Sequence, residues 1–238
     1  MTIDIEGNLA RITIVGGAWT LTAARDLAAA AQELVDNREV RVVIVNATGS
    51  DFCAGPASDL DPFDVHPDPA SALATLRPPV IAAINGLCLG PGLEVALATD
   101  IRVAGPRAQF ALDHIQSGTL PAWGGTQRLP RCVQPGVAVG LALLGTRFDA
   151  GTAAEMGLVY AVAEDPLTES ERLADQLLSR GPLALELSKE AVHRGSELPL
   201  RDGLRLEGDL NHQLAVTEDR AEGLQAFFDK RPPTFSGQ

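Results

Sequence analysis

The chain has 238 residues, of which 45% are hydrophobic and 4% aromatic. Aliphatic side chains must therefore supply most of the core, which favours an α/β architecture of helices packed against sheet. The formal net charge of −12 disfavours a nucleic-acid partner. Cys53, Cys88 and Cys132 lack the spacing of a zinc site or a disulfide framework, so we expect no metal and a reducing compartment.

The sequence predicts neither export nor a membrane span. Asp4 and Glu6 follow the first residue closely, where a secretory signal would carry basic and then apolar residues. The most apolar stretch, residues 80–98, is interrupted by Asn85, Glu94 and several glycines, which is unfavourable in a bilayer. We therefore expect a cytoplasmic protein without a membrane partner.

The first predicted elements are a β-hairpin, a helix and a strand. Ile3–Ile5 and Leu9–Val15 alternate in polarity around the turn signal Gly7-Asn8, which is typical of a hairpin. Residues Thr22 to Asp36 carry apolar side chains at helical spacing. Val40–Val45 is rich in valine, which predicts a strand buried on both faces.

The middle of the chain combines small-residue loops with buried elements. Residues 47–59 predict a loop whose backbone can approach a ligand closely. Val80–Ile84 predicts a short buried strand, and the turn Gly86–Gly92 leads from it into a helix over Pro91–Ala98. Proline is favourable as the first residue of such a helix.

The last predicted strands give way to a wholly helical region. Ile101–Ala104, Gln109–Leu112 and Leu158–Val162 are predicted strands, separated by short helical pieces. From about residue 165 leucines recur at helical spacing to the end, with a helix break at Gly181-Pro182. The pattern predicts a mixed domain over residues 1–165 and a helical region over residues 166–238.

Two turns of small residues could direct backbone N–H groups at a single carbonyl oxygen. They are Phe52–Gly55 and Asn85–Gly92, and each follows a predicted strand. Converging N–H groups are how an oxyanion hole is built. Glycine-rich turns more often serve only to reverse the chain, so the turns by themselves leave both interpretations open.

The order of motifs along the chain resembles the enoyl-CoA hydratase/isomerase (crotonase) family. The similar segments cover nearly the full length and are, in chain order, Phe52–Gly55, Pro79–Gly86, Gly90–Asp100, Pro121–Arg131, Gly151–Gly157 and Ala226–Arg231. The resemblance implies a core of spiralled ββα units with a C-terminal helical trimerisation region, assembled as a homotrimer or a dimer of trimers. It also implies a coenzyme A (CoA) thioester as substrate or ligand, with no permanently bound cofactor.

The resemblance implies acid/base roles for Glu94, His114 and Asp113. Glu94 matches the first catalytic glutamate of the family, and His114 stands where the second would be. Asp113 takes the preceding proline position. Histidine as a residue type changes charge near neutral pH, which suits proton transfer, although His114 could equally be a loop histidine without chemistry.

Two prolines stand where the family has the N–H donors of its oxyanion hole. Pro56 takes the first donor position and Pro91 the second, and proline has no N–H group. Ala57 or Ser58 could replace the first donor and Gly92 the second. Because losing one donor typically costs about 10²–10³ in rate, the sequence predicts weakened hydration.

Four further positions match CoA contacts of the family, namely Ala54, Asp59, Phe227 and Lys230. Three functions remain open from the residues alone. The first is a lyase or isomerase that acts on an acyl-CoA thioester through enolate stabilisation and acid/base chemistry, with Glu94 as its main group. The alternative is a non-catalytic acyl-CoA-binding protein of the same fold, which the two prolines favour. The third is a purely structural role as a trimer, which would predict no CoA binding.

Overall fold

The computed structural model describes all 238 residues and divides into two compact units. One unit comprises residues 1–76 and 80–174, and the other comprises residues 77–79 and 175–238. The domain boundary predicted between residues 165 and 166 stays a prediction. No helix is long and apolar enough to cross a membrane.

A six-stranded sheet with the order β1-β2-β3-β4-β6-β9 forms the centre of the first unit. Its strands are β1 (Thr2–Glu6), β2 (Leu9–Val15), β3 (Val42–Thr48), β4 (Val80–Ile84), β6 (Ile101–Ala104) and β9 (Ala161–Val162). The predicted hairpin is confirmed, because β1 and β2 pair antiparallel. All other neighbours are parallel, so the loops after β3, β4, β6 and β9 emerge at one edge of the sheet.

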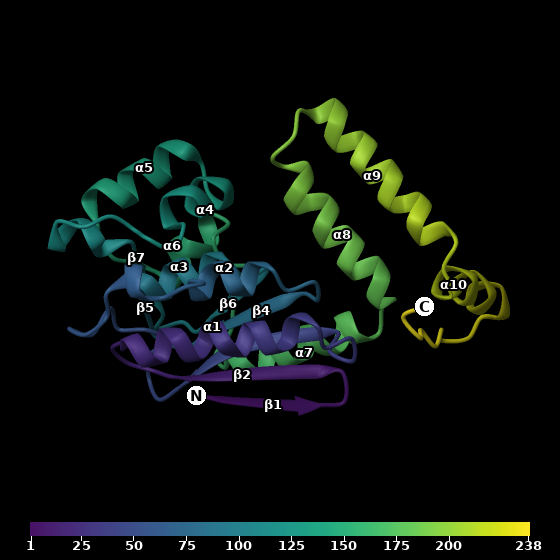
Figure 1. Cartoon of the computed structure of the whole chain (residues 1–238), viewed down its shortest axis with the longest axis horizontal. Coiled ribbons are helices and arrows are strands. Elements are labelled where there is room, and N and C mark those ends of the chain that lie inside the picture. Colours follow the sequence, from purple (N-terminus) through teal and green to yellow (C-terminus); the bar gives the residue numbers. More distant parts are fainter. The chain divides into compact units, whose positions relative to one another are not determined.

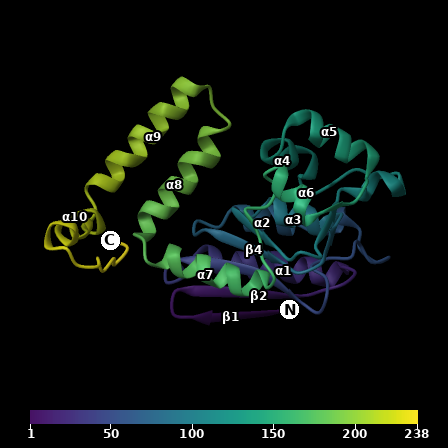
Figure 2. The same cartoon turned by 180° about the vertical axis from the view of Figure 1, so that it is seen from behind.

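Helices cover both faces of this sheet. On β2, Ala10, Ile12 and Ile14 are buried on one face, which α1 (Leu21–Val35) covers, whereas Arg11 on the other face binds Glu171 of α7 (Pro166–Leu178) at 2.7 Å. The two views accordingly show α1 and α7 on opposite sides of β2 (Figures 1 and 2). Thr20 caps α1 by accepting from the backbone N–H of Ala23.

A smaller sheet of three strands lies next to the site, in the order β5-β7-β8. Its strands are β5 (Leu87–Leu89), β7 (Gln109–Ala111) and β8 (Phe148–Asp149). The remaining elements of this unit are η1 (Pro62–Asp64), α2 (Pro69–Ala74), α3 (Pro91–Leu97), η2 (Asp113–Ser117), α4 (Gly125–Cys132), α5 (Pro135–Leu144) and α6 (Ala150–Glu155). The turn predicted over Gly86–Gly92 therefore contains a strand, and the strand predicted over Leu158–Val162 is confined to its last two residues.

The second unit consists of helices with a tail that folds back on the last of them. After the confirmed break at Gly181-Pro182 come α8 (Pro182–Gly195), α9 (Leu200–Ala215) and α10 (Glu218–Asp229). The buried carboxylate of Asp219 accepts from the backbone N–H groups of Ser236 and Gly237, at 2.6 Å and 3.0 Å. The C-terminal residues are thereby fixed at the first turn of α10.

Candidate active site

Glu94 reaches the core because the helix that carries it is buried along its whole length. The strand β5 leads into Gly90, whose φ of 51° belongs to the region that favours glycine, and Pro91 begins α3. All seven residues of α3 are buried, and Glu94 is 1% exposed. A carboxylate in such a position requires hydrogen-bond partners, because burying an unpaired charge is costly.

Three partners hold the Glu94 carboxylate. The backbone N–H groups of Trp123 and Gly125 donate to Oε1 at 2.7 Å and 2.9 Å. His114 Nε2 lies 3.1 Å from Oε2. The two backbone hydrogen bonds supply Oε1 with partners inside the core, which offsets the cost of burying the polar side chain of Glu94.

A positioning contact keeps the two backbone donors aimed at Glu94. The Arg128 guanidinium donates to the carbonyl oxygen of Trp123 at 2.5 Å, and it lies over Gly124, whose φ is 90°. A side chain at Gly124 would collide with this guanidinium, since a Cβ would stand 2.4 Å from Nη1. The sequence motif contained these residues, but their role as the cradle of Glu94 could not be predicted from it.

His114 and Asp113 face the turn that precedes α3. Both belong to η2, and a Cβ added to Gly90 would stand 3.1 Å from Asp113 Oδ1, 3.8 Å from His114 Cε1 and 3.8 Å from Pro56 Cδ. The structure thus brings together the predicted groups Glu94, His114, Asp113 and Pro56. His114 Nδ1 is buried, and no protein group forms a hydrogen bond with it.

Of the predicted substitute donors, Ala57 is engaged in another hydrogen bond and Gly92 is closely packed. The N–H of Ala57 donates to the carbonyl oxygen of Trp19 at 2.8 Å and so does not face a thioester. Gly92 packs against Cys53, because a Cβ on Gly92 would stand 2.2 Å from Cys53 Cβ. Ser58 is exposed, and Pro91 is buried as the first residue of α3.

The thiols of Cys53 and Cys88 are buried next to the candidate site, and they are unreactive. Burial raises the pKa of Cys53 to about 12, although hydrogen bonds with the backbone of Gly55 and Gly92 partly oppose the effect. Burial also raises the pKa of Cys88, which pairs with Cys53 through an isolated bridge of the backbone. Because the thiolate is the reactive form, neither cysteine is a candidate nucleophile.

The predicted CoA contacts fall in both units. The N–H of Ala54 donates to the carbonyl oxygen of Gly17 at 2.8 Å, and Asp59 is exposed in the same loop. In the second unit, Phe227 is 77% exposed, and Lys230 ends α10 with a φ of 55°. The CoA roles of these four residues stay predictions.

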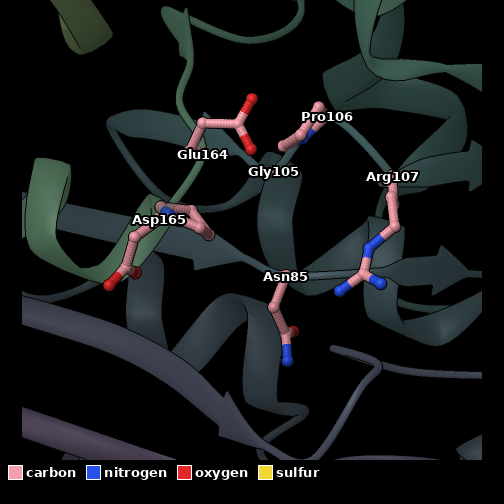
Figure 3. Close-up of a pocket in the computed structure, with 7 residues that line it drawn as sticks. Asn85, Gly105, Pro106, Arg107, Glu164 and Asp165 are labelled. Atoms are coloured by element: carbon pink, nitrogen blue, oxygen red, sulfur yellow. The ribbon is translucent and has the colours of Figure 1, made fainter.

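A separate open cavity of about 490 Å³ lies at the carboxyl edge of the six-stranded sheet. Figure 3 shows Asn85, Arg107 and Glu164 around it, on the loops that follow β4, β6 and β9. Asp165 also lines the cavity, but its carboxylate accepts hydrogen bonds from Thr168 and Leu167 at the start of α7, which lower its pKa. None of the groups that bind Glu94 lines this cavity.

Comparisons with known proteins agree with the resemblance seen in the motifs. A family model described as enoyl-CoA hydratase/isomerase matches residues 64–238. The 2,3-dehydroadipyl-CoA hydratase of Escherichia coli is 41% identical over 177 residues, which is 74% of this chain and 69% of that protein. The human mitochondrial enoyl-CoA hydratase domain-containing protein 2 is 36% identical over 225 residues, or 87% of this chain and 76% of the human protein.

Solved structures show the same fold over the whole chain. The crystal structure of enoyl-CoA hydratase from Bacillus anthracis matches with a TM-score of 0.90 at 32% identity, covering 100% of this chain and 99% of that one. The predicted α/β crotonase fold, with its two sheets and C-terminal helices, is therefore confirmed. The chain belongs to the enoyl-CoA hydratase/isomerase family.

Proposed function

We propose that the chain catalyses acid/base chemistry on an α,β-unsaturated acyl-CoA thioester, as a hydratase or isomerase, with Glu94 and His114 as the working pair. The observation that carries the proposal is the buried contact of 3.1 Å between Glu94 Oε2 and His114 Nε2. A buried carboxylate paired with a histidine is the arrangement that general acid/base catalysis uses. The hydratase names of the relatives support the same reaction class.

Hydration by this site is expected to be slow. As a thioester is attacked at its double bond, negative charge develops on the carbonyl oxygen, and backbone N–H donors normally stabilise it. Pro56 and Pro91 have no N–H, and the N–H of Ala57 is bound to Trp19. Each missing donor typically costs about 10²–10³ in rate, although the two losses need not add.

The missing N–H donors also support a second candidate, a non-catalytic acyl-CoA-binding protein. Pro56 is exposed beside the site, and Asp113 places a further carboxylate next to the turn where an oxyanion would form. A proline without an N–H and a nearby carboxylate both disfavour the negative charge of an enolate. They do not prevent other residues of the chain from binding CoA. The backbone hydrogen bonds from Trp123 and Gly125 to the buried carboxylate of Glu94 favour the enzyme.

One experiment separates the two candidates. Hydration of crotonyl-CoA and of longer enoyl-CoAs would be followed for the wild type, for Glu94→Gln and for the control Glu155→Gln, which changes an exposed residue of α6. Acyl-CoA binding would be measured by calorimetry on all three. We expect slow turnover that only Glu94→Gln abolishes; binding without turnover by the wild type would favour the binder, and absence of both would exclude both.

A further inference from the structure

The candidate site is open on one side of Glu94 and closed on the other. On the Oε2 side, the side chain of His114 is 13% exposed, and Pro56, which faces the same turn, is exposed. On the Oε1 side, Trp123 is 2% exposed and Gly125 is buried. A ligand therefore has to approach Glu94 from the side of His114 and Pro56.

The closed side is packed too tightly to admit an acyl chain. A Cβ added to Gly125 would stand 3.0 Å from both Glu94 Cγ and Leu112 Cδ2. Atoms in a well-packed core rarely approach so closely, so even one methyl group would strain the packing there. The largest side chain on this side is the indole of Trp123, whose backbone N–H donates to Glu94 Oε1 at 2.7 Å.

Both the backbone and the ring of Trp123 are held in place. Its carbonyl oxygen accepts from Arg128 at 2.5 Å, and its indole Nε1 donates to the carbonyl oxygen of Pro62 in η1 at 3.3 Å. The short helix η1 is itself held by Arg25, which donates to the carbonyl oxygen of Asp64 at 3.0 Å. The indole is therefore a fixed wall of the site.

The two sides determine how a thioester would lie. Its carbonyl oxygen belongs at the turn around Gly90 and Pro56, on the open side, and its reacting carbons belong at Glu94. The acyl chain then continues away from the thioester, towards the Oε1 side. We infer that Trp123 is a specificity-determining residue that ends the acyl site and restricts the substrate to short-chain enoyl-CoAs. This inference rests on the proposed function and names the substrate class within it.

The size of the expected preference follows from the number of carbon atoms that must fit. A crotonyl chain ends one carbon beyond its double bond, whereas an octenoyl chain has four further methylene groups. A single methylene group in an apolar pocket changes kcat/KM by about 10–200-fold. We expect kcat/KM of the wild type to be at least about 100-fold lower for octenoyl-CoA than for crotonyl-CoA.

Variants of Trp123 test whether the indole sets this limit. The measured quantity is the ratio of kcat/KM for octenoyl-CoA to that for crotonyl-CoA, which does not depend on the amount of folded protein. Trp123→Ala should raise the ratio about tenfold or more, and Trp123→Leu should raise it less. Trp123→Phe keeps a ring in the wall and loses only the bond to Pro62, so its ratio should stay within about threefold of the wild type.

The control is Trp19→Ala, which removes the other buried tryptophan, packed near Phe52. It should reduce the amount of folded protein and leave the ratio unchanged. Equal kcat/KM of the wild type for the two substrates would overturn the inference. An unchanged ratio in both Trp123→Ala and Trp123→Leu would overturn it as well.

Binding of saturated acyl-CoAs tests the inference without turnover. Calorimetry would compare butyryl-CoA with octanoyl-CoA on the wild type and on Trp123→Leu. A longer chain normally binds an apolar site more tightly. We expect instead that the wild type binds octanoyl-CoA about tenfold more weakly than butyryl-CoA, and that Trp123→Leu narrows the difference.

The two measurements distinguish the failure of this inference from that of the proposed function. A wild type that hydrates no enoyl-CoA but discriminates between the two chains through Trp123 would contradict the proposed function alone. A wild type that hydrates crotonyl-CoA but binds octanoyl-CoA as tightly as butyryl-CoA would contradict the role of Trp123 alone.

Discussion

At the residue scale, the ring of Pro56 occupies the space where a backbone N–H would point. Pro56 Cδ replaces the amide hydrogen, and it lies on the side of Gly90 that Asp113 and His114 also face. A non-proline residue at this position would therefore direct its N–H into the site. The same substitution at Pro91 would add an N–H in the first turn of α3.

We predict that Pro56→Ala combined with Pro91→Gly increases the rate of enoyl-CoA hydration. Each restored donor should contribute up to about 10²–10³ in kcat, because oxyanion donors act mainly on the transition state. The measurement is steady-state hydration of crotonyl-CoA, with the exposed Pro106→Ala as control. An unchanged kcat in the double variant would show that the missing donors do not limit the reaction.

Gly92 gives a stability prediction at the same scale. A methyl group there would meet Cys53 Cβ at 2.2 Å, so Gly92→Ala should destabilise the fold by about 1–3 kcal/mol through overpacking. Gly140→Ala is the matched control, because nothing lies within 4 Å of its added Cβ in α5. It should stabilise by about 0.5–1 kcal/mol. Chemical denaturation of both variants measures the difference, and equal midpoints would contradict the packing argument.

Motif positions in the sequence predict Glu94 and His114 as site residues, but they do not describe the surroundings of these two side chains. Both could be chosen from motif position, and the structure brings them within 3.1 Å. The partners of Glu94 are backbone N–H groups of Trp123 and Gly125, which any residue except proline can supply, so no side-chain pattern reveals them. The hydrogen bond from the N–H of Ala57 to the carbonyl oxygen of Trp19 could not be predicted either, because it also joins two backbone groups.

At the element scale, long periodic segments were predicted, whereas the short strands β5 and β8 were missed. The helix predicted over Thr22–Asp36 is α1, and the strand predicted over Val80–Ile84 is β4. The strands β5 and β8 have three and two residues, too few to display an alternating pattern. They exist because neighbouring strands pair with them, which is a tertiary effect.

The C-terminal tail provides a pH prediction at this scale. A bidentate hydrogen bond from Arg231, with a further bond from the backbone N–H of Thr234, lowers the pKa of Glu222 from the ordinary value of 4.5 to about 2. A pKa lowered by folding means that the ionised form stabilises the folded tail. This contribution is complete above pH 4.5 and is lost as the pH falls from 4.5 to about 2.

We therefore expect the amide resonance of Thr234 to shift in acid below pH 4.5, as the tail leaves α10. In Glu222→Gln the tail should be loosened already at neutral pH, and the acid transition should disappear. NMR titration of both proteins is the measurement. A transition of the Thr234 amide centred at pH 4.5 or above would contradict a lowered pKa of Glu222.

At the scale of the whole molecule, exposed apolar side chains indicate further contacts. The helix α5 is apolar almost all round, although only Ala138 in it is buried, whereas helices of this composition are usually covered. The larger exposed apolar residues of α5, α9 and α10 include Val139, Leu143, Leu144, Leu200, Leu204, Phe227 and Phe228. Surfaces of this kind commonly form interfaces between subunits.

We predict a homotrimer or a dimer of trimers in solution, with three or six times the chain mass of 25.0 kDa. Light scattering coupled to size exclusion would measure this mass over a dilution series. Replacing Leu143 and Leu144 by glutamate should shift the population to smaller species, because charges would enter an apolar interface. A mass of 25.0 kDa at every concentration would exclude the predicted assembly.

The two tryptophans of the chain each form a backbone hydrogen bond with a residue of the candidate site. The carbonyl oxygen of Trp19 accepts a hydrogen bond from the N–H of Ala57, the residue after Pro56. The backbone N–H of Trp123 donates to Glu94, and its indole N–H donates to the carbonyl oxygen of Pro62. Both indoles are almost fully buried. The protein thus contains two built-in fluorophores at the turns an acyl thioester would disturb, and replacing either with phenylalanine would leave the other as an unlabelled optical probe of occupancy.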